Sequence, residues 1–133
     1  MFNTSRLPFT QAAGPPDLHY AQAMEMISLV TKEASSRALA VVVCLRDRHD
    51  NLVAHIRMRN APLCSVDLAC QKARSSALFL FPSGAFKQFP GIELSNGIIS
   101  NLKGGLPLIT SEGQSAGSIG KYKFSYPDHL TKT

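Results

Sequence analysis

The feature that most constrains the fold is a predicted β-hairpin whose first strand is buried. Residues 39–45, LAVVVCL, are an uninterrupted apolar run rich in β-branched side chains, which is typical of a strand covered on both faces. Residues 46–51 bring charge and an Asp-Asn pair, as turns do. Residues 52–58 alternate, with Leu52, Ala54, Ile56 and Met58 on one face and Val53, His55 and Arg57 on the other. We therefore expect His55 and Arg57 to form one wall of a polar site beside a buried strand.

Two segments with helical periodicity flank the hairpin. The first begins after the candidate N-cap Asp17 and keeps its apolar spacing as far as Arg37. The second follows a bend at Pro62, has Ser65 as its candidate N-cap, and is ended by Pro82-Ser83-Gly84. Its predicted buried stripe is Val66, Ala69, Cys70, Ala73, Ala77 and Leu80.

The rest of the chain predicts three more strands and an α+β fold. These strands are expected at residues 97–101, 106–110 and 115–124. The order of helix, two strands, helix and three strands indicates a five-stranded antiparallel sheet flanked by helices. We expect one domain over residues 17–124, between an irregular N-terminal arm (1–16) and a polar tail (125–133).

Charge and composition limit the partners. The net charge is +5, but the basic residues are scattered, Trp is absent and no helix carries a basic stripe, which argues against nucleic-acid binding. Charged residues make up only 17%, below the usual quarter, so another subunit is expected to cover part of the surface of a homo-oligomer. No secretory signal or membrane-length apolar run is present, so a cytoplasmic protein without membrane contact is expected.

The three cysteines do not predict a metal site. Cys44, Cys64 and Cys70 lack the short spacing of zinc ligands. They are interpreted as small core-filling thiols in a reducing compartment.

A series of short motifs resembles a known family. The segments NLVAHIRM, APLCSVDLACQKARSSALF, FPSG, GGLPL and GSIG, which lie between residues 51 and 120, are similar to the GlcG/HbpS family of small haem-binding proteins, and the resemblance covers about residues 18–120. That family includes the C-terminal domain of PduO-type propanediol-utilisation proteins. The resemblance implies a five-stranded antiparallel sheet between helices, homo-oligomers, and haem as a cofactor.

The resemblance also singles out site residues. Asp67 and Lys72 match polar residues of the family's second helix, Arg57 matches its Arg-Met pair, and Gly104 with Gly105 matches its Gly-Gly-Leu-Pro segment. Arg57 would hold a propionate or a small acid, and the two glycines would let backbone approach a ligand. Contacts that only specify the fold are the alternative for all five residues.

Two histidines are the candidate haem ligands. Family members bind haem through a histidine in their N-terminal region, and His19 is a candidate metal ligand beside Tyr20 and two methionines. His55 is the second candidate. Each also has an ordinary structural interpretation, as a surface residue or as a hydrogen-bonded strand residue.

Two other functions stay open. In the first, the scaffold is a cofactor-independent isomerase, lyase or cyclase acting on a small organic acid or natural product. His55, Asp67 and Lys72 would then perform acid-base chemistry beside Arg57, in a pocket lined by phenylalanines that include Phe86. In the second, the chain is a non-catalytic oligomeric accessory protein.

Two departures from the family pattern bear on these expectations. Arg59 and Asn60 replace the acidic and small residues that usually follow the Arg-Met pair. The family's C-terminal helix is expected to be missing, because Gly120 is followed by Lys-Tyr-Lys-Phe-Ser-Tyr and a short polar tail.

Overall fold

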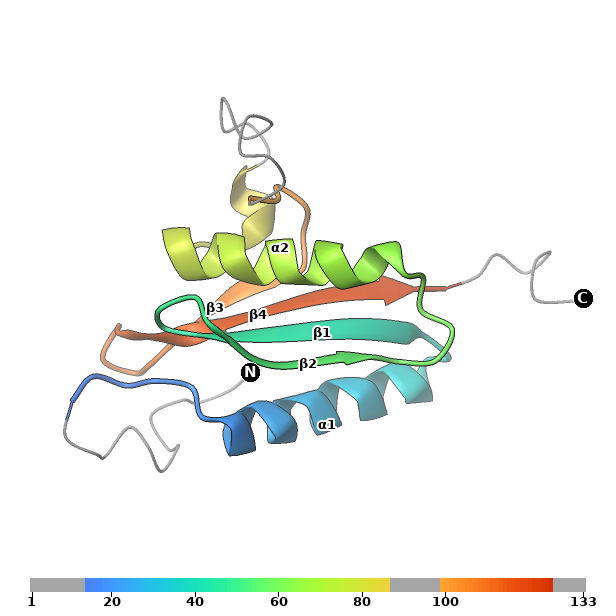
Figure 1. Ribbon diagram of the computed structural model, residues 1–133, viewed down its shortest axis with the longest axis horizontal. Helices are drawn as coiled ribbons and strands as arrows, with labels where there is room; N and C mark the ends of the chain where they lie inside the picture. The colour runs from blue at the N-terminus through green and yellow to red at the C-terminus, as the bar shows by residue number, and fades with distance from the viewer. Residues whose placement is uncertain (1–13, 87–98, 126–133) are drawn as a thin grey trace, which may run out of the picture.

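The computed structural model describes residues 14–86 and 99–125, in which one helix lies on each face of a four-stranded antiparallel sheet (Figure 1). The elements are α1 (Tyr20–Ser36), β1 (Ala40–Asp47), β2 (Leu52–Arg57), α2 (Cys64–Phe79), the short 3₁₀ helix η3 (Ser83–Phe86), β3 (Gly105–Ile109) and β4 (Ser115–Phe124). The strand order is β2-β1-β4-β3. Within these residues, no helix has the length and apolar character needed to cross a membrane.

The predicted hairpin is confirmed, and its first strand is buried on both faces. Residues 41–45 of β1 are at most 2% exposed. β1 pairs with β2 on one side, where Cys44 lies opposite His55, and with β4 along its whole length on the other. The apolar run could not be solvated at either face, so it occupies the interior of the sheet.

The alternation along β1 and β2 divides the core into two layers. Val41, Val43 and Leu45 pack with α1, and the β2 side chains predicted to share a face, apart from exposed Leu52, join them. Val42 and Cys44 pack with α2. Residues directly opposite in an antiparallel pair share a face, so His55 lies on the α2 side of the sheet, as Cys44 does.

Gly120 of β4 lets α2 lie directly on the sheet. A Cβ atom at this position would collide with the carbonyl oxygen of Ala69 and would lie 2.5 Å from the amide nitrogen of Ala73. The α2 side of the contact is built from alanines. The two backbones therefore touch without intervening side chains.

The helix starts differ from the sequence-based prediction. α1 is capped by His19 rather than by Asp17, whose carboxylate instead accepts the N–H groups of Leu18 and Arg48. α2 has no side-chain cap at its first turn, and the hydroxyl of Ser65 donates to the carbonyl of Pro62. These oxygens are engaged by neighbouring loops, which a reading of local sequence does not reveal.

The expected fifth strand is not shown. Residues 99–101 form no strand, and positions 97 and 98 lie outside the described residues. The N–H of Ser100 donates to the hydroxyl of Ser75 in α2, at 2.7 Å. That bond attaches this segment to the helix rather than to a strand ladder. The arm at 1–13 and most of the predicted tail, from position 126, also lie outside the described residues.

Candidate functional site

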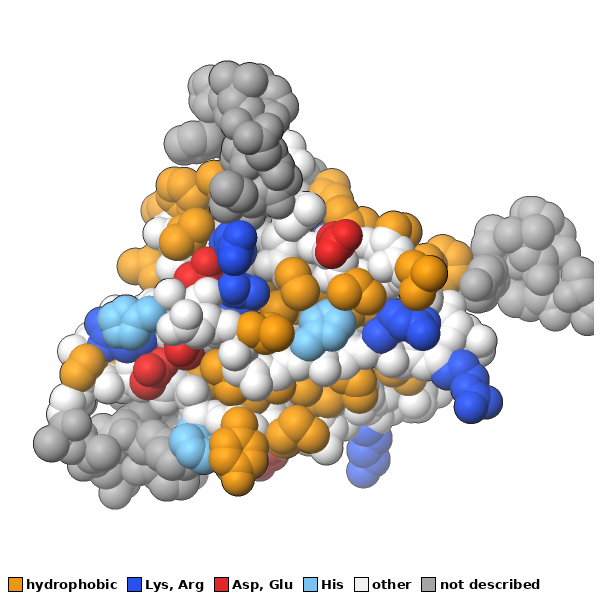
Figure 2. Space-filling view, in the orientation of Figure 1, with side chains coloured by type: hydrophobic (Ala, Val, Ile, Leu, Met, Phe, Trp, Pro, Cys, Tyr) orange, Lys and Arg blue, Asp and Glu red, His pale blue; other side chains and the backbone are white. Residues whose placement is uncertain are grey.

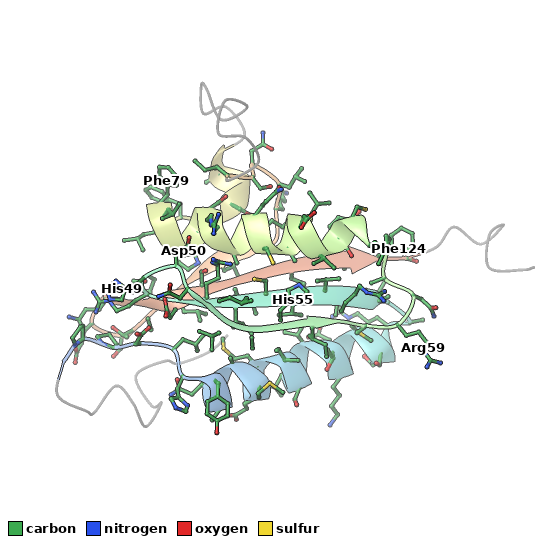
Figure 3. All side chains as sticks on the ribbon, in the orientation of Figure 1. His49, Asp50, His55, Arg59, Phe79 and Phe124 are labelled. Atoms are coloured by element: carbon green, nitrogen blue, oxygen red, sulfur yellow. The ribbon has the colours of Figure 1, made fainter. Side chains whose placement is uncertain are left out.

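His55 lies on the edge strand β2, facing α2. Its ring is partly exposed, but its Nε2 atom is buried and has no hydrogen-bond partner within the described residues. Figure 3 places His55 between β2 and α2, and in the same region of Figure 2 a histidine has hydrophobic side chains along part of its edge and a basic side chain on the other side. An imidazole nitrogen is therefore shielded from water at the edge of the sheet.

Two opposing effects act on the pKa of His55. Burial lowers this pKa, and an interaction with the Val66 backbone of α2 partly raises it. Burial is the larger effect, so the site favours the neutral imidazole.

Arg57 of β2 and Asp67 of α2 are both exposed to solvent, but they have different roles. Arg57 donates from Nη1 to the carbonyl oxygen of Ala61 at 2.7 Å, which fixes the bend between β2 and α2. Asp67 lies in the first turn of α2, where the helix dipole favours a carboxylate. In the described part of the chain, Asp67 forms no salt bridge with Arg57 or Lys72.

Lys72 is buried against the far half of the sheet. Its side chain is only 5% exposed, its Nζ donates to the carbonyl oxygen of Lys121 at 3.1 Å, and it lies 4.8 Å from the centre of the Tyr122 ring. A carbonyl and an aromatic face receive the amine, and burial, with a smaller effect of Lys121, lowers the pKa of Lys72.

Gly104 and Gly105 make room for this lysine. Gly104 has a φ of +125°, and a Cβ there would lie 3.1 Å from Nζ of Lys72. A Cβ on Gly105 would collide with the carbonyl oxygen of Lys72. The close backbone approach predicted for the pair is real, and it is made to α2 and β4. A ligand contact at these glycines stays a prediction.

His55 and Lys72 are not brought together. Arg57 on β2 and Tyr122 on β4 both pair with Val42 of β1, so they are two strands apart. Two strand spacings amount to about 10 Å. Since His55 contacts α2 from the β2 side and Lys72 reaches the β4 side, the acid-base group predicted from sequence is dispersed over the α2 face.

His19 lies with α1, on the opposite face of the sheet from His55. Its Nδ1 accepts the N–H of Ala21 at 3.3 Å, and its own N–H donates to Oε1 of Gln22 at 3.0 Å. The ring is 4.6 Å from that of Tyr20. Within one subunit, His19 and His55 therefore cannot ligate the same iron.

Of two further predictions, the one on Phe86 is not tested and the one on Leu80 is wrong. Phe86 ends η3, but its side chain lies outside the described residues. Leu80, predicted to be buried, is 51% exposed because α2 ends there in a left-handed turn that directs the chain away from the sheet. Among the described residues, no cluster of three His, Cys, Asp or Glu side chains could hold a metal ion.

We did not predict from the sequence that two of the cysteines lie together. Cys70 of α2 packs against the core cluster that contains Cys44 of β1. The sequence did contain a signal, because Cys44 alternates onto the α2 face and Cys70 lies on the stripe of α2 that faces the sheet. Joining the two required the position of the helix on the sheet.

Comparisons with known proteins agree with this architecture. The model of the family described as haem degrading protein HbpS-like matches residues 18–121. No curated protein matches the sequence. Klebsiella pneumoniae protein ORFY has a similar structure, with 28% identity, a TM-score of 0.77, and coverage of 84% of this chain and 82% of ORFY.

Two less similar structures share the fold. The PduOC:Heme complex has 21% identity and a TM-score of 0.74, covering 82% of this chain and 84% of PduOC. A double mutant of Streptomyces reticuli HbpS has 23% identity and a TM-score of 0.73, covering 84% of this chain and 78% of that one.

Proposed function

We propose that this chain, which belongs to the HbpS-like family of haem-degrading proteins, binds haem and that His55 would hold its iron. The family supports a haem-related function in general terms. One structural observation carries the choice of His55: its Nε2 is buried without a hydrogen-bond partner among the described residues.

The surroundings of the two histidines favour His55 as an iron ligand. A neutral imidazole is the form that binds metals, and burial lowers the pKa of His55. The Nδ1 of His19 instead accepts an N–H from Ala21, so the neutral ring of His19 carries its proton on Nε2. Ligation through that nitrogen would break the helix cap.

Other residues of the chain fit the remaining parts of haem. The exposed Arg57 and Arg59 follow His55 at the end of β2, and Figure 3 places Arg59 at that end. Guanidinium groups suit the carboxylates of haem propionates. Haem, when bound, would supply iron redox chemistry, while the chain would orient it and exclude water. Since Nε2 is covered, side chains at the sheet edge must move aside as haem enters.

The test is a titration of the purified protein with hemin, followed by the Soret band. We expect His55→Gln, which removes the ligand but preserves size and polarity, to weaken binding at least about tenfold. His19→Asn is the matched control, because Asn is a strong helix N-cap and cannot replace histidine as an iron ligand. It should leave binding unchanged.

The outcomes distinguish the two histidines. If His55→Gln binds hemin like the wild type and His19→Asn does not, the ligand is on the α1 side and our assignment is wrong. If the wild-type protein shows no Soret shift, haem binding itself is wrong. Circular dichroism of each variant checks that the fold is intact.

A further inference from the structure

Two thiols of unequal exposure meet between β1 and α2. Cys44 is fully buried in the layer beneath α2, and Cys70 is partly exposed on α2 itself. Cys70 packs against the core cluster that contains Cys44, and each thiol alters the pKa of the other. The third cysteine, Cys64, is exposed at the start of α2. The pair thus combines a thiol that solvent can reach with a neighbouring thiol that solvent cannot.

A cluster of charged residues borders the pair. The carboxylate of Asp50 joins two arginines, with Oδ1 2.5 Å from Nε of Arg46 and Oδ2 2.9 Å from Nε of Arg74. Arg46 follows Cys44 by two positions on β1, and Arg74 follows Cys70 by four positions on α2, so each arginine shares a face with one of the cysteines. Two guanidinium groups, one of them on a buried residue, therefore come from positions next to the thiols.

We propose that Cys70 and Cys44 form a peroxide-reactive dithiol that closes to a disulfide between α2 and β1. The Cys70 thiolate attacks the O–O bond of a hydroperoxide and becomes a sulfenic acid, and the leaving oxygen takes up a proton as water or an alcohol. The Cys44 thiol then attacks the Cys70 sulfur, and a second water leaves as the disulfide forms. The two sulfurs together lose two electrons, which the peroxide gains.

The order of reaction follows from the exposure of the two sulfurs. Cys70 is partly exposed, whereas Cys44 is fully buried. A hydroperoxide in solvent therefore reaches Cys70 first, and Cys70 is the attacking group.

The test uses haem-free protein at neutral pH, so that it is independent of the proposed haem site. Trypsin leaves Cys64 and Cys70 on one peptide, since cleavage follows Arg59 and Lys72. The experiment is therefore made in the Cys64→Ser variant, treated with a small excess of hydrogen peroxide. We expect the intact mass to fall by two hydrogens and a cross-linked peptide to join Cys44 to Cys70. Dithiothreitol should reverse both changes.

Two further variants, each combined with Cys64→Ser, assign the roles of the attacking and the resolving thiol. In Cys44→Ala, Cys70 should stop at the sulfenic acid and be labelled by dimedone. In Cys70→Ala, neither disulfide nor label should form. The proposal is overturned if Cys64→Ser loses no hydrogens under peroxide, if the cross-link forms only after unfolding in urea, or if dimedone labels Cys44 first.

Discussion

At the scale of single residues, Lys72 is unusual because its amine is buried and has no carboxylate partner among the residues that the structure describes. Its pKa is lowered, so the unfolded chain holds this proton more tightly than the folded one. The folded state therefore gains stability as pH rises from the folded pKa towards 10.5. We expect Lys72→Met to equal the wild type or exceed it by about 1 kcal/mol at neutral pH. In urea unfolding, this advantage should shrink near pH 10.5. Lys32→Met, at an exposed position of α1, should show no such trend. A loss of several kcal/mol at neutral pH in Lys72→Met would contradict us.

At the scale of elements, the end of α2 stores backbone strain. Leu80 has a φ of +61°, and a left-handed conformation costs a non-glycine residue about 1–2 kcal/mol. Because its side chain is half-exposed, little packing is lost on removing it. We expect Leu80→Gly to raise the free energy of unfolding by about 0.5–1 kcal/mol in urea denaturation. Leu78→Gly, at an equally exposed position inside α2, should instead lower it by about 1 kcal/mol. Equal losses in both variants would show that Leu80 contributes more by packing than it costs in strain.

At the scale of the whole molecule, the outer surface of α1 exposes large apolar side chains. Tyr20, Met24 and Leu29 are each more than half exposed, as is typical of a surface that another subunit covers. We propose that the protein forms a homo-oligomer through contacts of α1. Such an oligomer is compatible both with a haem protein and with a non-catalytic accessory protein. Light scattering should give a mass above that of one chain for the wild type and a lower one for Met24→Lys combined with Leu29→Lys. Glu112→Lys changes an exposed charge in the turn between β3 and β4 and should not alter the mass. A monomeric wild type at high concentration would refute this.

The sequence predicted the elements whose signals are local. The apolar run of β1 and the alternation of β2 were enough to place His55 on the side of the sheet opposite Ala54 and Ile56. The burial of Lys72 was not predictable, because it depends on Gly104 and Gly105, which follow some thirty residues later and leave the necessary space. For the same reason, the contact between Cys44 and Cys70 required the fold.

Gly120 has a consequence for the whole group of related folds. The separation of α2 from the sheet is set here by the absence of a side chain at one position of β4. In a relative with alanine at this position, the helix that corresponds to α2 must lie farther from the sheet. The space between helix and sheet would then be larger. One methyl group would thus decide whether a bulky planar molecule fits between helix and sheet or only at the edge of the sheet.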